Sequence, residues 1–99
     1  MYHRFNESKY PSTNIDMDIF RKHVEMIKNN NFQFYNPNNF ENEFYSKKND
    51  KKILLTIDDA FTSFYKNAWP YLKENKIPFI LFVSTKPVGK NGYMTWEQI

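Results

Sequence analysis

The clearest pattern along this chain is a pair of apolar runs in its second half. Residues 53–57 read Ile-Leu-Leu-Thr-Ile, and residues 79–83 read Phe-Ile-Leu-Phe-Val. Near-continuous apolar runs that contain β-branched residues are typical of strands covered on both faces, as in a parallel sheet. The pattern therefore predicts two buried strands.

The segment between these runs has the spacing of a helix and ends at Asn75 and Lys76. Pro70 lies inside it and predicts a kink, because proline removes a backbone donor and its ring crowds the preceding turn. Strand, helix and strand in this order form a βαβ unit, so the fold class is α/β. The apolar residues at helical spacing are Phe64, Ala68, Tyr71 and Leu72.

A second helix is predicted over residues 17–29. Asp16 is its expected N-cap, and the run of asparagines at 29–31 is its expected end, since Asn tolerates a left-handed backbone. The apolar residues that share one face of this helix are Met17, Phe20, Val24 and Ile27.

The remaining segments are weakly patterned. Short strands are expected near residues 2–5 and 32–35, and residues 36–50 are expected to be mostly loop, with room for one helical turn at 40–45.

The last residues read Thr95-Trp96-Glu97-Gln98-Ile99, and Thr95 with Gln98 fits a capping box, which marks the start of a helix. A helix that consists only of its first turn has no apolar face to bury against the rest of the fold. We therefore expect residues 1–99 to be part of one domain that continues beyond Ile99 in a longer product.

The composition and net charge of the chain limit the classes of protein to which it can belong. The chain is 40% hydrophobic and 19% aromatic, which favours a folded domain over a disordered one. The net charge of +3 comes from scattered lysines, and the basic stretch at residues 47–52 is interrupted by Asp50, so we expect a solvated surface and no nucleic-acid partner.

The chain has no cysteine, which excludes disulfides, thiolate ligands and a cysteine nucleophile. No apolar stretch approaches the roughly 20 residues that a membrane span needs. Residues 1–10 are polar and show no signal peptide, so the compartment stays undetermined, and is cytoplasmic if Met1 is the true start.

The candidate chemistry lies in Asp58 and Asp59, directly after the first apolar run. Parallel α/β folds carry their sites at the carboxyl ends of strands. One carboxylate there can bind a divalent cation, and the other can take a proton from a metal-bound water. The alternative is that one of them caps the following helix.

The sequence Thr56-Ile57-Asp58-Asp59-Ala60 resembles the Thr-Phe-Asp-Asp-Gly signature of polysaccharide deacetylases. The similarity spans most of the chain, and residues 53–83 are its specific part. The other segments that resemble family members are Tyr2-His3-Arg4-Phe5, Pro70-Tyr71-Leu72-Lys73, Ile77-Pro78 and Trp96.

This resemblance implies the opening portion of a deformed (β/α) barrel. It also implies a metal-dependent hydrolase that removes N-acetyl groups from the amino sugars of a polysaccharide or oligosaccharide. Asp58 would be the general base, and Asp59 would ligate a divalent metal, with zinc as the first choice. His3 and Trp96 are candidate neighbours of the pocket.

The sequence also departs from the family pattern. The two histidine ligands are expected in a His-(Ser/Thr)-x-x-x-His motif after Trp96, and that motif is not among the 99 residues. His23 is expected to have a packing or surface role. Ala60 replaces a glycine and would be strained if that position needs φ > 0. We expect this chain alone to bind metal weakly and to hydrolyse nothing.

Two other functions remain open at this point. One is a non-catalytic module, either a degenerate deacetylase-like domain or a glycan-binding one. The other is a receiver-like signalling domain, which also places an acidic pair after a strand. That domain needs a phosphoacceptor aspartate at a later strand end, whereas here residues 83–85 read Val-Ser-Thr.

Overall fold

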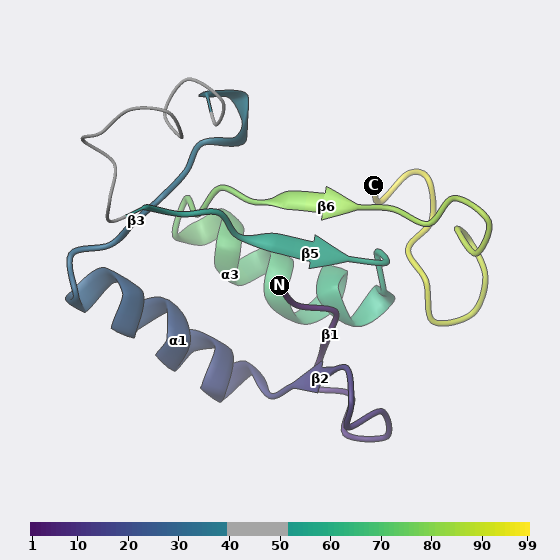
Figure 1. Cartoon of the computed structure of the whole chain (residues 1–99). Coiled ribbons are helices and arrows are strands. Elements are labelled where there is room, and N and C mark those ends of the chain that lie inside the picture. Colours follow the sequence, from purple (N-terminus) through teal and green to yellow (C-terminus); the bar gives the residue numbers. More distant parts are fainter. Residues whose placement is uncertain (40–51) are drawn as a thin grey trace.

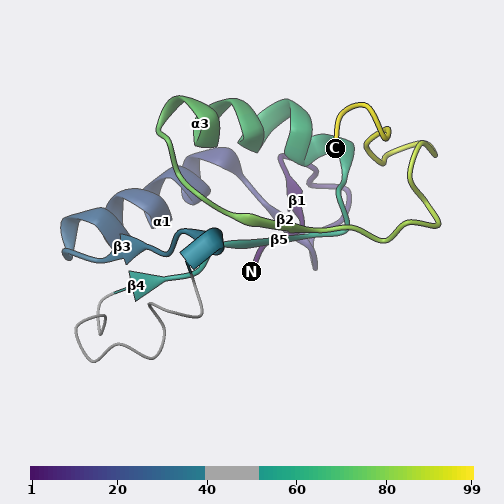
Figure 2. The same cartoon turned by 90° about the horizontal axis from the view of Figure 1, so that it is seen from above.

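The structure is a computed structural model that describes residues 1–39 and 52–99. The helical turn expected at 40–45 and most of the expected loop at 36–50 therefore lie outside the described residues. Two helical segments cover one side of a set of short parallel strands (Figures 1 and 2). No helix in the described ranges is long and apolar enough to cross a membrane.

The centre of the fold is strand β5 (Thr56–Asp58). It pairs in parallel with β6 (Ile80–Phe82), with Thr56 opposite Ile80. On its other side, Tyr2 forms a parallel bridge to Ile57. The Tyr2 amide donates to the Thr56 carbonyl (3.0 Å), and the Asp58 amide donates to the Tyr2 carbonyl (2.8 Å). β5 is therefore held between the N-terminal segment and β6.

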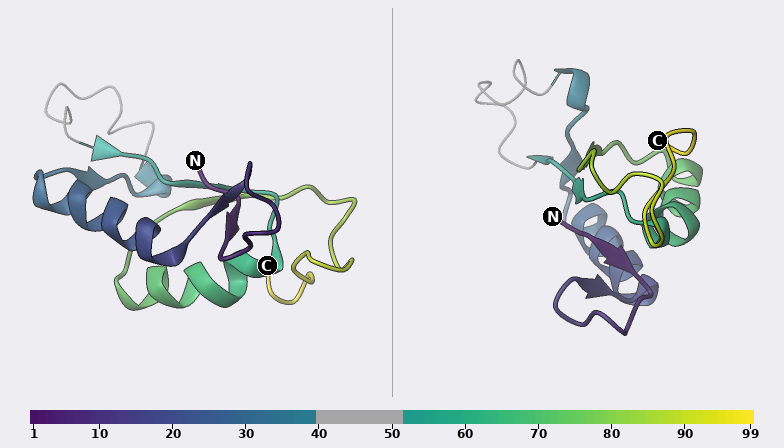
Figure 3. Two further views of the ribbon diagram at one scale, coloured as in Figure 1. Left: turned by 90° about the horizontal axis from the view of Figure 1, so that it is seen from below. Right: turned by 90° about the vertical axis from the view of Figure 1, so that its right-hand side faces the viewer.

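Two further parallel pairs flank this centre. β1 (Arg4–Phe5) pairs with β2 (Asn14–Ile15), and β3 (Gln33–Phe34) pairs with β4 (Lys52–Ile53). Figure 3 shows the first pair beyond the N-terminal end of helix α1 and the second near its C-terminal end.

The predicted single strand at 53–57 is divided into β4 and β5, with Leu54 and Leu55 between them. The physical reason is that the two halves pair with different strands. β4 pairs with β3, whereas β5 lies between Tyr2 and β6.

Helix α1 (Met17–Asn29) has the predicted bounds and buries Met17, Phe20 and Val24. Asp16 occupies the N-cap position, but its side chain makes no capping hydrogen bond. Instead, the Oδ1 atom of Asn6 accepts from the Met17 amide at 2.7 Å. The cap is thus supplied from the loop after β1, which ties that loop to the helix.

The crossover from β5 to β6 begins as a π-helix, η2 (Phe64–Ala68), and continues as α3 (Trp69–Glu74). The Trp69 amide bonds to the Phe64 carbonyl five residues back, and Pro70 lies in the first turn of α3, where its missing N–H costs little. The predicted irregularity at Pro70 is therefore a π-helical turn before it. The helix ends at Glu74 with Asn75 as its C-cap, which agrees with the predicted end at Asn75 and Lys76.

The core joins α1, the crossover, β1 and β5. Its largest fully buried side chains are Phe5, Phe20, Phe64, Ile57, Leu72 and Val24. Burial of β5 is confirmed for one face only, since Ile57 is 0% exposed but Thr56 and Asp58 are partly exposed. Two-sided burial of β6 is wrong: Phe82 is 53% exposed, because within the described residues one face of this strand is left open to solvent.

The capping box predicted near the C-terminus is formed. The Thr95 amide donates to Gln98 Oε1 (2.9 Å), and the Gln98 amide donates to Thr95 Oγ1 (3.3 Å). The Ile99 amide also bonds to the Thr95 carbonyl (3.2 Å), which is the spacing of a first helical turn.

Candidate active site

The acidic pair stands at the carboxyl end of β5, as predicted. Asp58 is the last residue of the strand, and Asp59 follows it directly. The Asp59 amide donates to the Phe82 carbonyl (2.9 Å), which fixes the start of the turn against β6. Ser84, just after β6, donates its hydroxyl to Asp59 Oδ1 (3.3 Å).

The turn that carries the pair has an unusual backbone. Asp59 (φ 73°) and Ala60 (φ 50°) are both left-handed. This conformation costs about 1–2 kcal/mol for a residue with a Cβ atom. Strain of this kind persists where the surroundings hold it, and it is common at functional sites. The strain expected for alanine at position 60 is confirmed.

Three backbone hydrogen bonds hold this turn. Besides the bond from Asp59 to β6, the Met94 amide donates to the Ala60 carbonyl (2.9 Å) and the Thr62 amide donates to the Gly92 carbonyl (2.9 Å). Ala60 is also 1% exposed, so its methyl group is packed on all sides. The segment after β6 therefore stabilises the strained turn of the acidic pair.

His3 lies beside the first carboxylate. Its Nε2 atom is 3.4 Å from Asp58 Oδ2, and the side chains are 31% and 20% exposed. The bridge between Tyr2 and Ile57 places it there, since it fixes the preceding residue against β5. The contact is an ion pair when the imidazole is protonated.

Two further residues were singled out in the sequence, Trp96 and His23. Trp96 is 63% exposed in the turn of the capping box. The second histidine of the chain, His23, shares a hydrogen bond of 2.8 Å between its Nδ1 atom and the Tyr2 hydroxyl. This is the packing role expected for it.

A metal centre needs several ligands around one point. Within residues 1–39 and 52–99, no group of three or more His, Cys, Asp or Glu side chains is arranged to hold a metal ion. The oxygen donors of Asp58 and Asp59 suit a divalent cation, but with His3 they do not make a complete centre.

One neighbour of the pair was missed from the sequence. Ser84 follows β6, and the ends of neighbouring parallel strands meet at one edge of the sheet. The signal that could have found it is therefore the pairing of the two predicted strands, which brings the residues after each strand together.

A parallel strand that ends in an acidic pair and a strained turn defines an α/β protein with a candidate site at the carboxyl end of its sheet. The family model described as "Polysaccharide deacetylase" matches residues 45–99, more than half of the chain. The chain belongs to the polysaccharide deacetylase family.

Two curated relatives are similar over nearly the whole chain. One is a putative polysaccharide deacetylase, YxkH, of Bacillus subtilis (27% identical, covering 100% of this chain and 36% of the relative). Another is a poly-beta-1,6-N-acetyl-D-glucosamine N-deacetylase of Staphylococcus aureus (26% identical, covering 96% and 33%). The chain thus spans about a third of the length of these relatives.

Two solved structures share the fold. IcaB from Ammonifex degensii superposes with a TM-score of 0.78 at 33% identity, over 98% of this chain and 43% of that one. The Streptococcus pyogenes deacetylase PplD gives a TM-score of 0.79 at 22% identity, over 99% and 47%. The predicted α/β fold of the deacetylase type is confirmed, and the barrel remains a prediction.

Proposed function

We propose that this chain carries the acidic pair of a metal-dependent hydrolase that removes N-acetyl groups from the amino sugars of a polysaccharide. The observation that carries the proposal is the position of Asp58 and Asp59 on a strained turn at the end of β5, in a chain of the polysaccharide deacetylase family. The similarity to an enzyme named for poly-beta-1,6-N-acetyl-D-glucosamine supports a polymer of N-acetylglucosamine as substrate.

In the proposed reaction, water adds to the carbonyl carbon of the acetamido group and the carbon–nitrogen bond breaks. The products are acetate and the free amine of the sugar. Asp58 is the proposed general base, which takes a proton from the attacking water. Its carboxylate is 20% exposed, so a water molecule can reach it, and His3 lies against one of its oxygens.

Asp59 is the proposed metal ligand, for a divalent ion such as zinc. The described residues do not complete a centre for such an ion. The proposal therefore requires further ligands from outside the described residues, and the resemblance to the family implies that two of them are histidines. Ser84 donates to Asp59 Oδ1, which would orient that carboxylate.

We further propose that β5 and β6, with the bridge from Tyr2, open a deformed (β/α) barrel. The parallel register of these segments and the similarity to deacetylase structures support this arrangement. The remaining strands of the barrel would come from outside the described residues.

The catalytic proposal is tested in a chimera. The 99 residues replace the matching third of the S. aureus enzyme, and release of acetate from β-1,6-linked N-acetylglucosamine oligomers is measured. We expect activity in the chimera and its loss in Asp58→Asn and Asp59→Asn. The matched control is Asp18→Asn, an exposed aspartate of α1, which should retain activity. Activity that survives in Asp58→Asn would refute the role of Asp58 as the base.

The metal proposal is tested on the chain itself, so that it does not depend on a folded chimera. Manganese(II) is titrated, and the broadening of backbone amide signals is followed by NMR. We expect weak binding that broadens the amides of Asp58, Asp59 and Ala60 first. Asp59→Asn should remove this effect and Asp18→Asn should keep it. Equal broadening in the parent and in Asp59→Asn would overturn the assignment.

A non-catalytic glycan-binding module is the second candidate. It is favoured by the absence of a complete metal centre within the described ranges. A properly folded chimera without hydrolysis, together with oligomer binding that is unchanged in Asp58→Asn and Asp59→Asn, would establish this function in place of catalysis.

A further inference from the structure

A ladder of stacked side chains runs beside the strained turn. The Arg4 guanidinium lies between two rings, 3.8 Å from the centroid of Tyr10 and 3.7 Å from that of Phe61. Phe61 in turn packs on Tyr93, with ring centroids 4.9 Å apart and planes inclined by 35°. We call these four residues the Arg4 ladder. Its outer member Tyr10 is 40% exposed, so one end of the ladder faces solvent.

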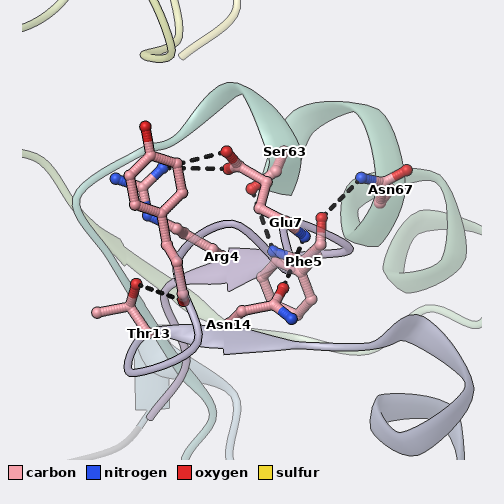
Figure 4. Close-up of polar contacts among 8 residues, drawn as sticks. Arg4, Phe5, Glu7, Thr13, Asn14, Ser63 and Asn67 are labelled. Carbon is pink, nitrogen blue, oxygen red and sulfur yellow. Dashed lines mark hydrogen bonds and ion pairs between the residues drawn. The ribbon is translucent and has the colours of Figure 1, made fainter.

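The charge of Arg4 is balanced within this group. Its Nη1 atom donates to both carboxylate oxygens of Glu7 at 3.2 Å, and Figure 4 shows the two side chains facing each other. The Glu7 amide donates to Asn14 Oδ1 (2.7 Å), which fixes the loop between β1 and β2. The buried Nε atom of Arg4 has no hydrogen-bond partner in the described structure, so Glu7 and the two rings hold the guanidinium.

The ladder is rigidly connected to the acidic pair. Phe61 follows Asp59 by two residues and forms an antiparallel bridge with Tyr93. The bonds from the Met94 amide to the Ala60 carbonyl and from the Thr62 amide to the Gly92 carbonyl lie on either side of this bridge. A ligand held by the ladder would therefore keep a fixed position relative to Asp59.

A hollow of about 310 Å³ opens along the ladder. This volume is at the lower end of the range of small-ligand sites. The hollow is lined by two tyrosines and an asparagine amide, and its one cation and one anion neutralise each other. Its lining residues are Arg4, Glu7, Tyr10, Asn91, Gly92 and Tyr93.

These features favour one chemical class of ligand. A phosphate or another anion would have to compete with Glu7 for Arg4, and a metal ion would find a single carboxylate that is already paired. A neutral ring with many hydroxyl groups matches the lining, because its hydroxyls can bond to polar groups while its C–H face packs on tyrosine.

We propose that this hollow is a subsite for one sugar ring of the polysaccharide, adjacent to the residue whose acetamido group is cleaved. The inference rests on the proposed function and adds the place where the polysaccharide substrate is bound next to the site of cleavage. The subsite recognises the sugar ring and its hydroxyls, so an acetyl group is not required there.

The test is an NMR titration of the chain with short β-1,6-linked oligomers of N-acetylglucosamine and of glucosamine. We expect both oligomers to shift the amide signals of Asn91, Gly92 and Tyr93. Tyr93→Ala should weaken binding about five- to tenfold, as for the loss of one aromatic contact. Tyr10→Ala provides a second variant in an exposed loop, for the case that Tyr93→Ala does not fold.

The control variant is Tyr65→Ala, because Tyr65 lines a separate apolar hollow. It should leave oligomer affinity unchanged. The subsite is refuted if neither oligomer shifts these amides, or if Tyr93→Ala and Tyr10→Ala both bind as the parent does. Asp58→Asn should keep the shifts. Binding that persists in a chimera without hydrolysis would retain the subsite while removing the catalytic proposal, so the two failures are distinguishable.

Discussion

His3 Nε2 lies 3.4 Å from Asp58 Oδ2, although His3 is near the start of the chain and Asp58 ends β5. The contact depends on backbone pairing, since the Tyr2 carbonyl accepts from the Asp58 amide itself. The N-terminal segment is therefore a structural part of the candidate site, and changes there should affect the carboxylate.

The first prediction concerns this contact. In the chimera with the S. aureus enzyme, His3→Ala should lower kcat about tenfold or more, since residues that orient a catalytic group typically contribute 10–100-fold. The free energy of unfolding should change by less than about 1 kcal/mol, because the pair is partly exposed. His3→Gln should recover part of the rate through a hydrogen bond. A His3→Ala enzyme with the parent's kcat would show that the contact has no role in the reaction.

The second prediction concerns the strained turn. Ala60→Gly removes the strain of a left-handed backbone, which costs about 1–2 kcal/mol. It also removes a buried methyl group, which stabilises the fold by about 0.8 kcal/mol. We therefore expect a gain in stability of about 0.5 kcal/mol, measured by urea unfolding.

The matched control is Ala68→Gly. Ala68 is 0% exposed but has a right-handed backbone, with φ −89°. The same substitution should destabilise the protein there by about 2 kcal/mol, because helix propensity and the buried methyl are both lost. Equal destabilisation at both positions would mean that the turn at Ala60 is not strained.

The third prediction concerns the start of α1. Because Asn6 Oδ1 accepts from the Met17 amide at 2.7 Å, Asn6→Ala should cost about 1–2 kcal/mol of stability. Asp16→Ala should cost less than about 0.5 kcal/mol, since the Asp16 side chain makes no capping bond. The two free energies of unfolding are measured by chemical denaturation. A larger loss of stability in Asp16→Ala than in Asn6→Ala would mean that Asn6 does not cap the helix.

The sequence predicts those features of the structure that depend on residues close together along the chain, and misses those that depend on residues far apart. Helical periodicity predicts α1 to its bounds, and the apolar run predicts the buried β5, because both are properties of neighbouring residues. The division between β4 and β5 was not predicted, since it results from a change of pairing partner. The contact between His3 and Asp58 depends on a bridge between distant segments, so no local pattern predicts it, and only the resemblance to the family named His3 as a neighbour of the pocket.

The candidate site shows the same limit. The acidic pair is evident in the sequence because it directly follows a strand. Ser84 and the Arg4 ladder are not evident, because each unites residues from segments far apart in the chain.

The fourth prediction concerns pH. Burial raises the pKa of Tyr2 above its ordinary value of 10.0. The folded state therefore holds the phenol proton more tightly than the unfolded state. The stability that the protonated phenol of Tyr2 contributes is fully present below pH 10 and is lost as the pH rises through the folded-state pKa.

Unfolding free energies of the parent and of Tyr2→Phe at neutral pH give the cost of losing the hydrogen bond to His23, about 1 kcal/mol. The same comparison above pH 10 should show a smaller difference, because the parent loses stability there and Tyr2→Phe lacks that loss. An unchanged difference between the two proteins would contradict the raised pKa.

The last prediction concerns association. Strand β6 leaves Phe82 53% exposed, and within the described residues it has a paired neighbour only on the side of β5. An apolar strand with a free edge is a template for pairing with a second copy. We expect the 99-residue chain to associate as its concentration rises in sedimentation velocity, and Phe82→Lys to reduce this association. Ile19→Lys, at a 46% exposed apolar position on α1, is the control and should leave it unchanged. If the chain stays monomeric at every concentration, or if both lysines act equally, the open edge of β6 does not drive association.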